Sequence, residues 1–191
     1  RIGAELAAGA SLADNSASFG FLIFLFYLGC ATIALTHHAI QAVRTRRDPD
    51  SIGTPLYLAL MALPTLGSAV VVAWALSFWS NLSIIMLALS PVGLLTSLGM
   101  YRYVYRRPTQ EMAWFYEHMG ALLGAGIAFH TAFLVFGSRI FFDLTILGQY
   151  NWVPWVAPGV IGTIASRYWE AYYRRKFGDL PAAAGGAELN A

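Results

Sequence analysis

The sequence predicts an all-α integral membrane protein, a bundle of five transmembrane helices. Three observations predict this class. Charged residues make up only 12% of the 191 residues, against about 25% in an ordinary soluble domain. The stretch 52–101 contains no Asp, Glu, Lys, Arg or His. Apolar residues run continuously, as in 21–28, without the period-two alternation that a membrane barrel requires.

Four uncharged stretches supply the five spans. A bilayer-spanning helix needs about 20 mostly apolar residues, so the long stretch 52–101 holds two helices. Only Trp79-Ser80-Asn81 separates these two, and a connection this short makes them an antiparallel hairpin. The predicted spans are 18–43, 56–78, 82–103, 112–137 and 152–168, within one membrane domain, 18–179, flanked by tails 1–17 and 180–191.

The basic residues predict the orientation of the bundle. With five spans, all but two of the twelve basic residues fall on one side of the membrane, and only Arg1 and Arg139 lie opposite. The positive-inside rule makes the basic side cytoplasmic, so the amino terminus is outside and the carboxyl terminus is inside. The residues on the basic side are Arg44, Arg46, Arg47, Arg102, Arg106, Arg107, Arg167, Arg174, Arg175 and Lys176.

Two connecting features complete the layout. The outer loop 138–151 is too apolar for water but carries Asp143 and Asn151, so we expect it to lie along the membrane surface or against another protein. The basic group Arg167, Arg174, Arg175 and Lys176 after the fifth span predicts contact with lipid headgroups. Pro91-Val92-Gly93 and Pro158-Gly159 favour kinks in the third and fifth spans.

The fourth span holds the residues best suited to chemistry. Glu117 and His118 lie in its first turns, and ionisable groups at membrane depth are candidates for function. Glu117 is therefore the candidate catalytic residue, although a solvated position at the interface also fits it. Gly120, Gly124 and Ala128 follow on the same helix, and small residues at this spacing predict close packing against another helix.

Histidines of the first and fourth spans predict a cofactor site. His37 and His38 lie one to two turns inside Arg44, and His118 has a comparable depth in an antiparallel helix. Two facing imidazoles are suited to axial ligation of haem b, and with Glu117 the same group suits a metal ion. Simple hydrogen bonding across the bundle is the alternative for each of these histidines.

Several other sites are excluded or unsupported. His130 lies about 18 Å along the helix from His118 and cannot join the same site. One cysteine, Cys30, permits no internal disulfide. The sequence has no phosphate-binding loop, no serine-nucleophile motif and no nucleic-acid-binding module, so nucleic acid is not an expected partner.

The segment from His118 through Gly120, Gly124 and Gly126 to His130 and Phe133 resembles a motif of uncharacterised small multi-pass bacterial membrane proteins. It covers residues 118–133. The resemblance implies a location in the bacterial inner membrane and implies no activity.

Three functional hypotheses follow from the sequence. The first is an accessory or structural subunit of a larger bacterial inner-membrane complex, without chemistry of its own, whose partners are lipid and other membrane subunits. The second is a redox protein that binds haem b or a metal ion through His118 and either His37 or His38. The third is a small transporter or lipid-modifying enzyme that moves protons through Glu117 and His118.

Overall fold

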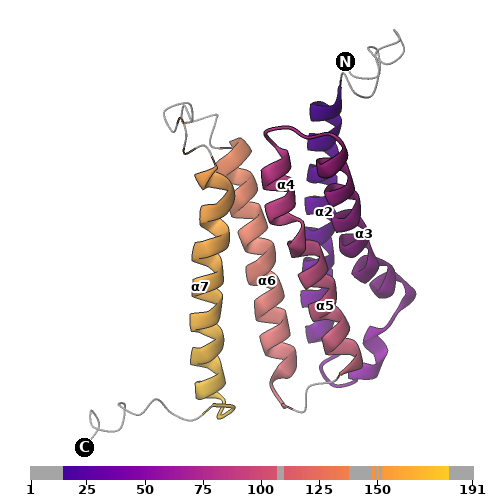
Figure 1. Ribbon diagram of the computed structural model, residues 1–191. Helices are drawn as coiled ribbons and strands as arrows, with labels where there is room; N and C mark the ends of the chain where they lie inside the picture. Colours follow the sequence, from indigo (N-terminus) through magenta and orange to yellow (C-terminus); the bar gives the residue numbers. More distant parts are fainter. Residues whose placement is uncertain (1–14, 107–109, 138–147, 149, 151, 181–191) are drawn as a thin grey trace, which may run out of the picture.

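The computed structural model describes residues 15–106, 110–137, 148, 150 and 152–180. Within these residues the chain is helical and has no strand, which confirms the predicted all-α class. Long helices run side by side in alternating directions (Figure 1). The elements are α2 (Ser16–Arg44), η1 (Pro49–Ile52), α3 (Pro55–Ser77), α4 (Ser83–Leu89), α5 (Pro91–Tyr105), α6 (Ala113–Ala132), η2 (Phe133–Gly137) and α7 (Val153–Lys176).

Four helical segments of the described chain are long and apolar enough to cross a membrane. They are Ser16–Arg44, Pro55–Ser77, Ser83–Tyr105 and Ala113–Gly137. At most 39% of the residues in their apolar windows are buried inside the protein, and large apolar side chains such as Phe26, Leu66 and Phe129 are exposed. A surface of this kind fits a multi-pass membrane protein, because lipid is the solvent that tolerates it.

α7 is the remaining long helix, and it does not reach the same apolar level. Its sequence includes Arg167 and Glu170 and ends on Arg174, Arg175 and Lys176, so α7 is not one of the four segments apolar enough to cross a membrane. In the structure α7 runs antiparallel to α6 along its full length (Figure 1). The fifth crossing and the orientation of the bundle therefore stay predictions.

α2 lies at the centre of the helical packing. It packs against α3 on one side and α6 on the other and also touches α5, whereas α7 packs on α6. α2, α5 and α7 end, and α3 and α6 begin, at the lower end of Figure 1. We call this the basic end, because Arg44, Arg102 and Arg174 lie in the last turns of the three helices that end there.

The third predicted span is divided at Ser90 into α4 and α5, directly before Pro91-Val92-Gly93, from which a kink is predicted. The Tyr27 hydroxyl from α2 is placed at the break, where it accepts the Gly93 N–H at 2.7 Å and lies 2.9 Å from the Ser90 carbonyl oxygen. Pro158 lies inside α7, which is one continuous helix.

Apolar packing near the basic end positions the candidate site. A cluster of buried residues joins α2, α3, α5 and α6 there. Tyr57 of α3 and Tyr103 of α5 belong to it, and both rings lie against His38 of α2. The predicted outer loop 138–151 lies outside the described residues apart from Gly148 and Tyr150, as do residues 1–14 and 181–191 of the two tails.

Candidate functional site

A hydrogen-bonded chain of three side chains, two of them buried, lies near the basic end. His38 of α2 is 2% exposed. Its Nε2 lies 3.0 Å from Oε2 of Glu117 on α6, and its Nδ1 lies 2.7 Å from the hydroxyl oxygen of Tyr57 on α3. The three side chains come from three different helices, so the fold brings them together from positions far apart in the sequence.

Local features of each helix set the depth of this chain. His38 lies six residues before Arg44, which is about 9 Å along the helix axis. Tyr57 lies in the first turn of α3, where its N–H is capped by the Thr54 hydroxyl at 3.2 Å. Glu117 lies in the second turn of α6. Because α2 runs antiparallel to α3 and α6 (Figure 1), these three positions come to one level.

The protonation states of Glu117 and His38 are linked through this chain. A carboxylate only accepts hydrogen bonds, so His38 donates its Nε2 proton to ionised Glu117, and the Tyr57 hydroxyl then donates to Nδ1. Every polar atom is satisfied in this arrangement, with a neutral imidazole. A proton taken up by Glu117 can bind the other carboxyl oxygen, Oε1, while Oε2 still accepts the hydrogen bond from Nε2.

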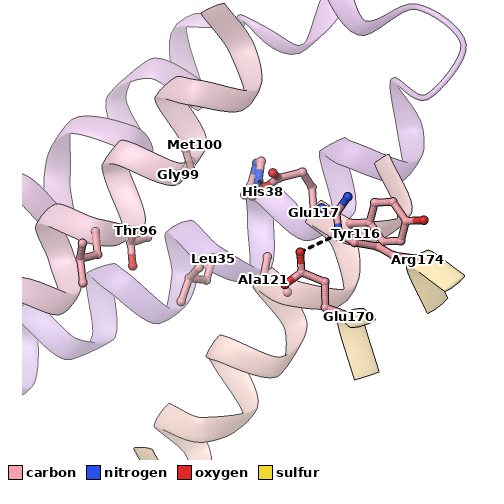
Figure 2. Close-up of a pocket in the computed structure, with 12 residues that line it drawn as sticks. Leu35, His38, Thr96, Gly99, Met100, Tyr116, Glu117, Ala121, Glu170 and Arg174 are labelled. Atoms are coloured by element: carbon pink, nitrogen blue, oxygen red, sulfur yellow. Dashed lines mark hydrogen bonds and ion pairs between the residues drawn. The ribbon is translucent and has the colours of Figure 1, made fainter. Parts of the chain in front are cut away.

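A pocket of about 260 Å³ opens beside Glu117 (Figure 2). It lies between α5 and α6, which both pack on α2, and α7 closes one side. Its apolar or small lining residues are Leu35, Leu95, Gly99, Met100, Gly120 and Ala121. Its polar lining residues are His38, Thr96, Tyr116, Glu117, Glu170 and Arg174.

Glu170 and Arg174 form an ion pair at the α7 side of the pocket, shown by the dashed line in Figure 2. The Arg174 Nε donates to Glu170 Oε1 at 2.9 Å, and the guanidinium lies 4.2 Å from the centre of the Tyr116 ring. The Tyr116 hydroxyl donates to a carboxylate oxygen of Asp179. The basic side chain nearest the pocket is thus already neutralised.

The four basic residues predicted to meet lipid headgroups differ in their surroundings. The Arg174 side chain is 24% exposed and faces the pocket, whereas the Arg167 side chain is 81% exposed. Arg175 and Lys176 are exposed, and the Lys176 Nζ lies 5.8 Å from the Tyr173 ring. Arg167, Arg175 and Lys176 are therefore exposed, and their contact with lipid headgroups stays a prediction.

The other histidines have partners of their own. His118 donates from Nδ1 to the Ala39 carbonyl oxygen at 2.9 Å, across the α2–α6 interface. His37 lies 3.4 Å from the side-chain nitrogen of Gln41, one turn along its own helix. His130 is exposed and donates to the Gly126 carbonyl oxygen of its own helix at 2.8 Å. Glu117 is therefore paired with His38, while His118 bonds to the backbone.

These positions bear on the predicted haem or metal site. Both ring nitrogens of His38 are engaged in hydrogen bonds, while Nε2 of His118 is the nitrogen not used in the bond to Ala39. Within the described part of the chain, no three His, Cys, Asp or Glu side chains gather closely enough to hold a metal ion. A haem ligated by His38 and His118 would therefore require His38 to leave Glu117 or Tyr57, whereas ligation by His37 and His118 stays a prediction.

The small residues predicted to mediate packing have unequal surroundings. A Cβ added at Gly124 would lie 3.3 Å from Leu35 Cδ1 of α2, so this glycine allows close approach of the two helices. A Cβ at Gly120 would meet no heavy atom within 4 Å, and Gly120 lines the pocket. Ala128 is half-buried.

Sequence reasoning did not select Tyr57 and Tyr103. Both belong to predicted spans in which aromatic residues are common, so their identity alone carried no signal. Their depth was the available signal, because Tyr57 and Tyr103 lie near the basic ends of their spans, as His38 does. A tyrosine hydroxyl buried at that level needs a hydrogen-bond partner, and a histidine at the same level is a suitable one. Comparison with family models, with curated proteins and with solved structures finds no match to this chain.

Proposed function

We propose that this protein is a small proton-coupled membrane transporter in which Glu117 binds the proton and His38 is its hydrogen-bonded partner. The observation that carries this proposal is the 3.0 Å contact between a carboxylate and a buried histidine beside a pocket. Ionisable groups at membrane depth are costly and mark proton and substrate pathways. The proposal keeps Glu117 from the third sequence hypothesis and replaces His118 by His38 as its partner.

The surroundings of Glu117 support transport over catalysis. Its side chain is 36% exposed, so it is reached from the pocket, while the His38 side chain behind it is 3% exposed. The polar pocket residues are acids, one arginine, one tyrosine, one histidine and Thr96. Among the described contacts, no basic side chain is hydrogen-bonded to the Thr96 hydroxyl. The lining therefore offers proton-binding groups rather than an activated nucleophile.

An infrared titration of the protein in lipid tests this proposal. We expect the difference spectrum between acidic and alkaline buffer to contain a carboxylic acid band that Glu117→Gln removes. Glu111→Gln is the matched control, because Glu111 is an exposed acid near the start of the same helix and outside the pocket. His38→Gln should shift the frequency of the band, because the carboxyl group loses its imidazole hydrogen-bond partner. A band unaffected by Glu117→Gln overturns the proposal.

The other two sequence hypotheses stay predictions. An accessory subunit should retain partner subunits in fixed proportion during purification in mild detergent. A haem or metal protein should show an absorption spectrum or bound metal after purification, dependent on His118 and either His37 or His38.

A further inference from the structure

The pocket contains one carboxylate that lacks a permanent cationic partner. Its charged lining residues are Glu117, Glu170 and Arg174. Arg174 donates a hydrogen bond to the Glu170 carboxylate at 2.9 Å and another to the Gln110 side-chain oxygen at 3.2 Å. The described hydrogen-bond partner of the Glu117 carboxylate is His38, which as a neutral imidazole does not cancel the carboxylate charge. Ionised Glu117 therefore gives the pocket a net negative charge.

The walls beside this carboxylate are apolar and leave room. Leu95 lies on the rim and is 64% exposed, so the pocket opens onto the apolar outer surface of the bundle. Gly99 and Gly120 line opposite walls on α5 and α6, and a Cβ added at either would meet no heavy atom within 4 Å. An apolar tail can lie between these glycines while its polar head meets Glu117.

We propose that the pocket binds a small single-chain amphipathic cation, an ammonium group on one apolar tail, with the ammonium on Glu117. This inference rests on the proposed function and names its substrate class. Charge complementarity favours a cation over an anion. The volume of about 260 Å³ lies below the roughly 300–1,000 Å³ of pockets for drug-sized ligands, which favours a short free molecule over a two-chain bilayer lipid.

Cation and proton then compete for the same carboxylate. When the cation binds to protonated Glu117, the carboxylic acid loses its proton to solvent and the carboxylate pairs with the ammonium, so one proton is released for each cation bound. The titratable and charged groups around Glu117 are His38 of α2, with Tyr57 of α3 behind it, Tyr103 of α5, Tyr116 of α6, and Glu170 and Arg174 of α7.

Binding of octyltrimethylammonium to the purified protein in non-ionic detergent tests the inference. Octyl sulfate and octyl glucoside are the matched probes, with the same tail and an anionic or neutral head. At a pH where Glu117 is ionised, we expect the cation to bind at least about tenfold more tightly than the other two, given the strength of bonds to charged groups. At a lower pH, where Glu117 carries a proton, binding of the cation should be weaker and should release that proton. A pH dye in weak buffer should report proton release.

Two glycine variants of one helix separate the pocket from the rest of α6. Gly120→Leu places a side chain in the pocket and should abolish cation binding while keeping the Glu117 infrared band. Gly126→Leu is the control, because Gly126 also has open space around it but does not line the pocket. It should bind the cation as the unchanged protein does.

The outcomes distinguish the inference from the proposed function. A Glu117 band without cation binding, or equal binding of all three probes, overturns the inference and leaves the proton-binding role standing. A carboxylic acid band that Glu117→Gln does not remove overturns both the inference and the proposed function. Binding of phosphatidylethanolamine in bilayer discs that displaces octyltrimethylammonium would replace the small cation by a lipid and also overturns the inference as stated.

Discussion

At the scale of single residues, buried polar groups of this bundle are paired across helices. His38 joins α2 to α3 and α6 through Tyr57 and Glu117. His118 joins α6 to α2 through a backbone carbonyl. No buried side-chain nitrogen or oxygen in the described residues lacks a hydrogen-bond partner. Such satisfaction is required in an apolar surrounding, because an unpaired polar group there costs several kcal/mol.

Tyr27 offers a direct test of this pairing. Tyr27→Phe leaves the Gly93 N–H and the Leu89 carbonyl oxygen at the α4–α5 break without their side-chain partner, while the Ser90 carbonyl oxygen keeps the Ser68 hydroxyl. We expect a loss of about 1–3 kcal/mol in the free energy of unfolding, the cost of leaving buried groups unsatisfied. Reversible unfolding in mixed micelles measures it.

The control for Tyr27 is Tyr101→Phe, because Tyr101 is 47% exposed. It should change the free energy of unfolding by less than about 0.5 kcal/mol, as surface substitutions usually do. Equal effects of the two substitutions would show that the Tyr27 hydroxyl does not hold the broken helix.

The sequence allowed Glu117 and His38 to be selected as candidates but not paired. Ionisable residues in an apolar stretch stand out without any structure, and the depth of His38 followed from its distance to Arg44. The choice between His37 and His38, and between His38 and His118 as the partner of Glu117, depends on how each helix is rotated. Residue spacing fixes depth along a helix but not the direction in which its neighbours lie.

At the scale of elements, hydropathy predicts the positions of the first helices closely, and Pro91 marks the point where the third span is divided. The first two spans, predicted at 18–43 and 56–78, correspond to Ser16–Arg44 and Pro55–Ser77. The third is divided at Ser90, where Pro91 begins a new helix. Pro64 and Pro158 instead lie inside continuous helices, so the presence of proline alone does not determine where a helix divides.

α7 shows where hydropathy is least informative. Charges in its second half lower its apolar character, yet its length and its packing on α6 match those of the other long helices. α7 and α6 approach each other closely at Gly162, because a Cβ added there would lie 2.3 Å from Ile127 Cγ1 of α6. The charges of α7 near the pocket, Glu170 and Arg174, pair with each other, which reduces the cost of placing them beside lipid.

At the scale of the whole molecule, the five-span arrangement makes a prediction about the two faces of the membrane. In a Cys30→Ser background, we expect cysteines at Arg47 and Lys176 to react with an impermeant thiol reagent from the same side, the cytoplasm. A cysteine at Asn81 should react from the opposite side. All three positions are exposed in the structure. Labelling of Arg47→Cys and Lys176→Cys from opposite sides would mean that α7 does not cross.

The central claim is that His38 and Glu117 are in contact inside the bundle. Solid-state magnetic resonance of the protein in lipid, with isotope-labelled histidine nitrogens and glutamate carboxyl carbons, measures this contact directly. We expect a through-space correlation that His38→Gln abolishes and His130→Gln preserves, because a single histidine–carboxylate contact occurs within the described residues. A spectrum without that correlation, or one in which it survives His38→Gln, would contradict the proposed pairing of Glu117 with His38.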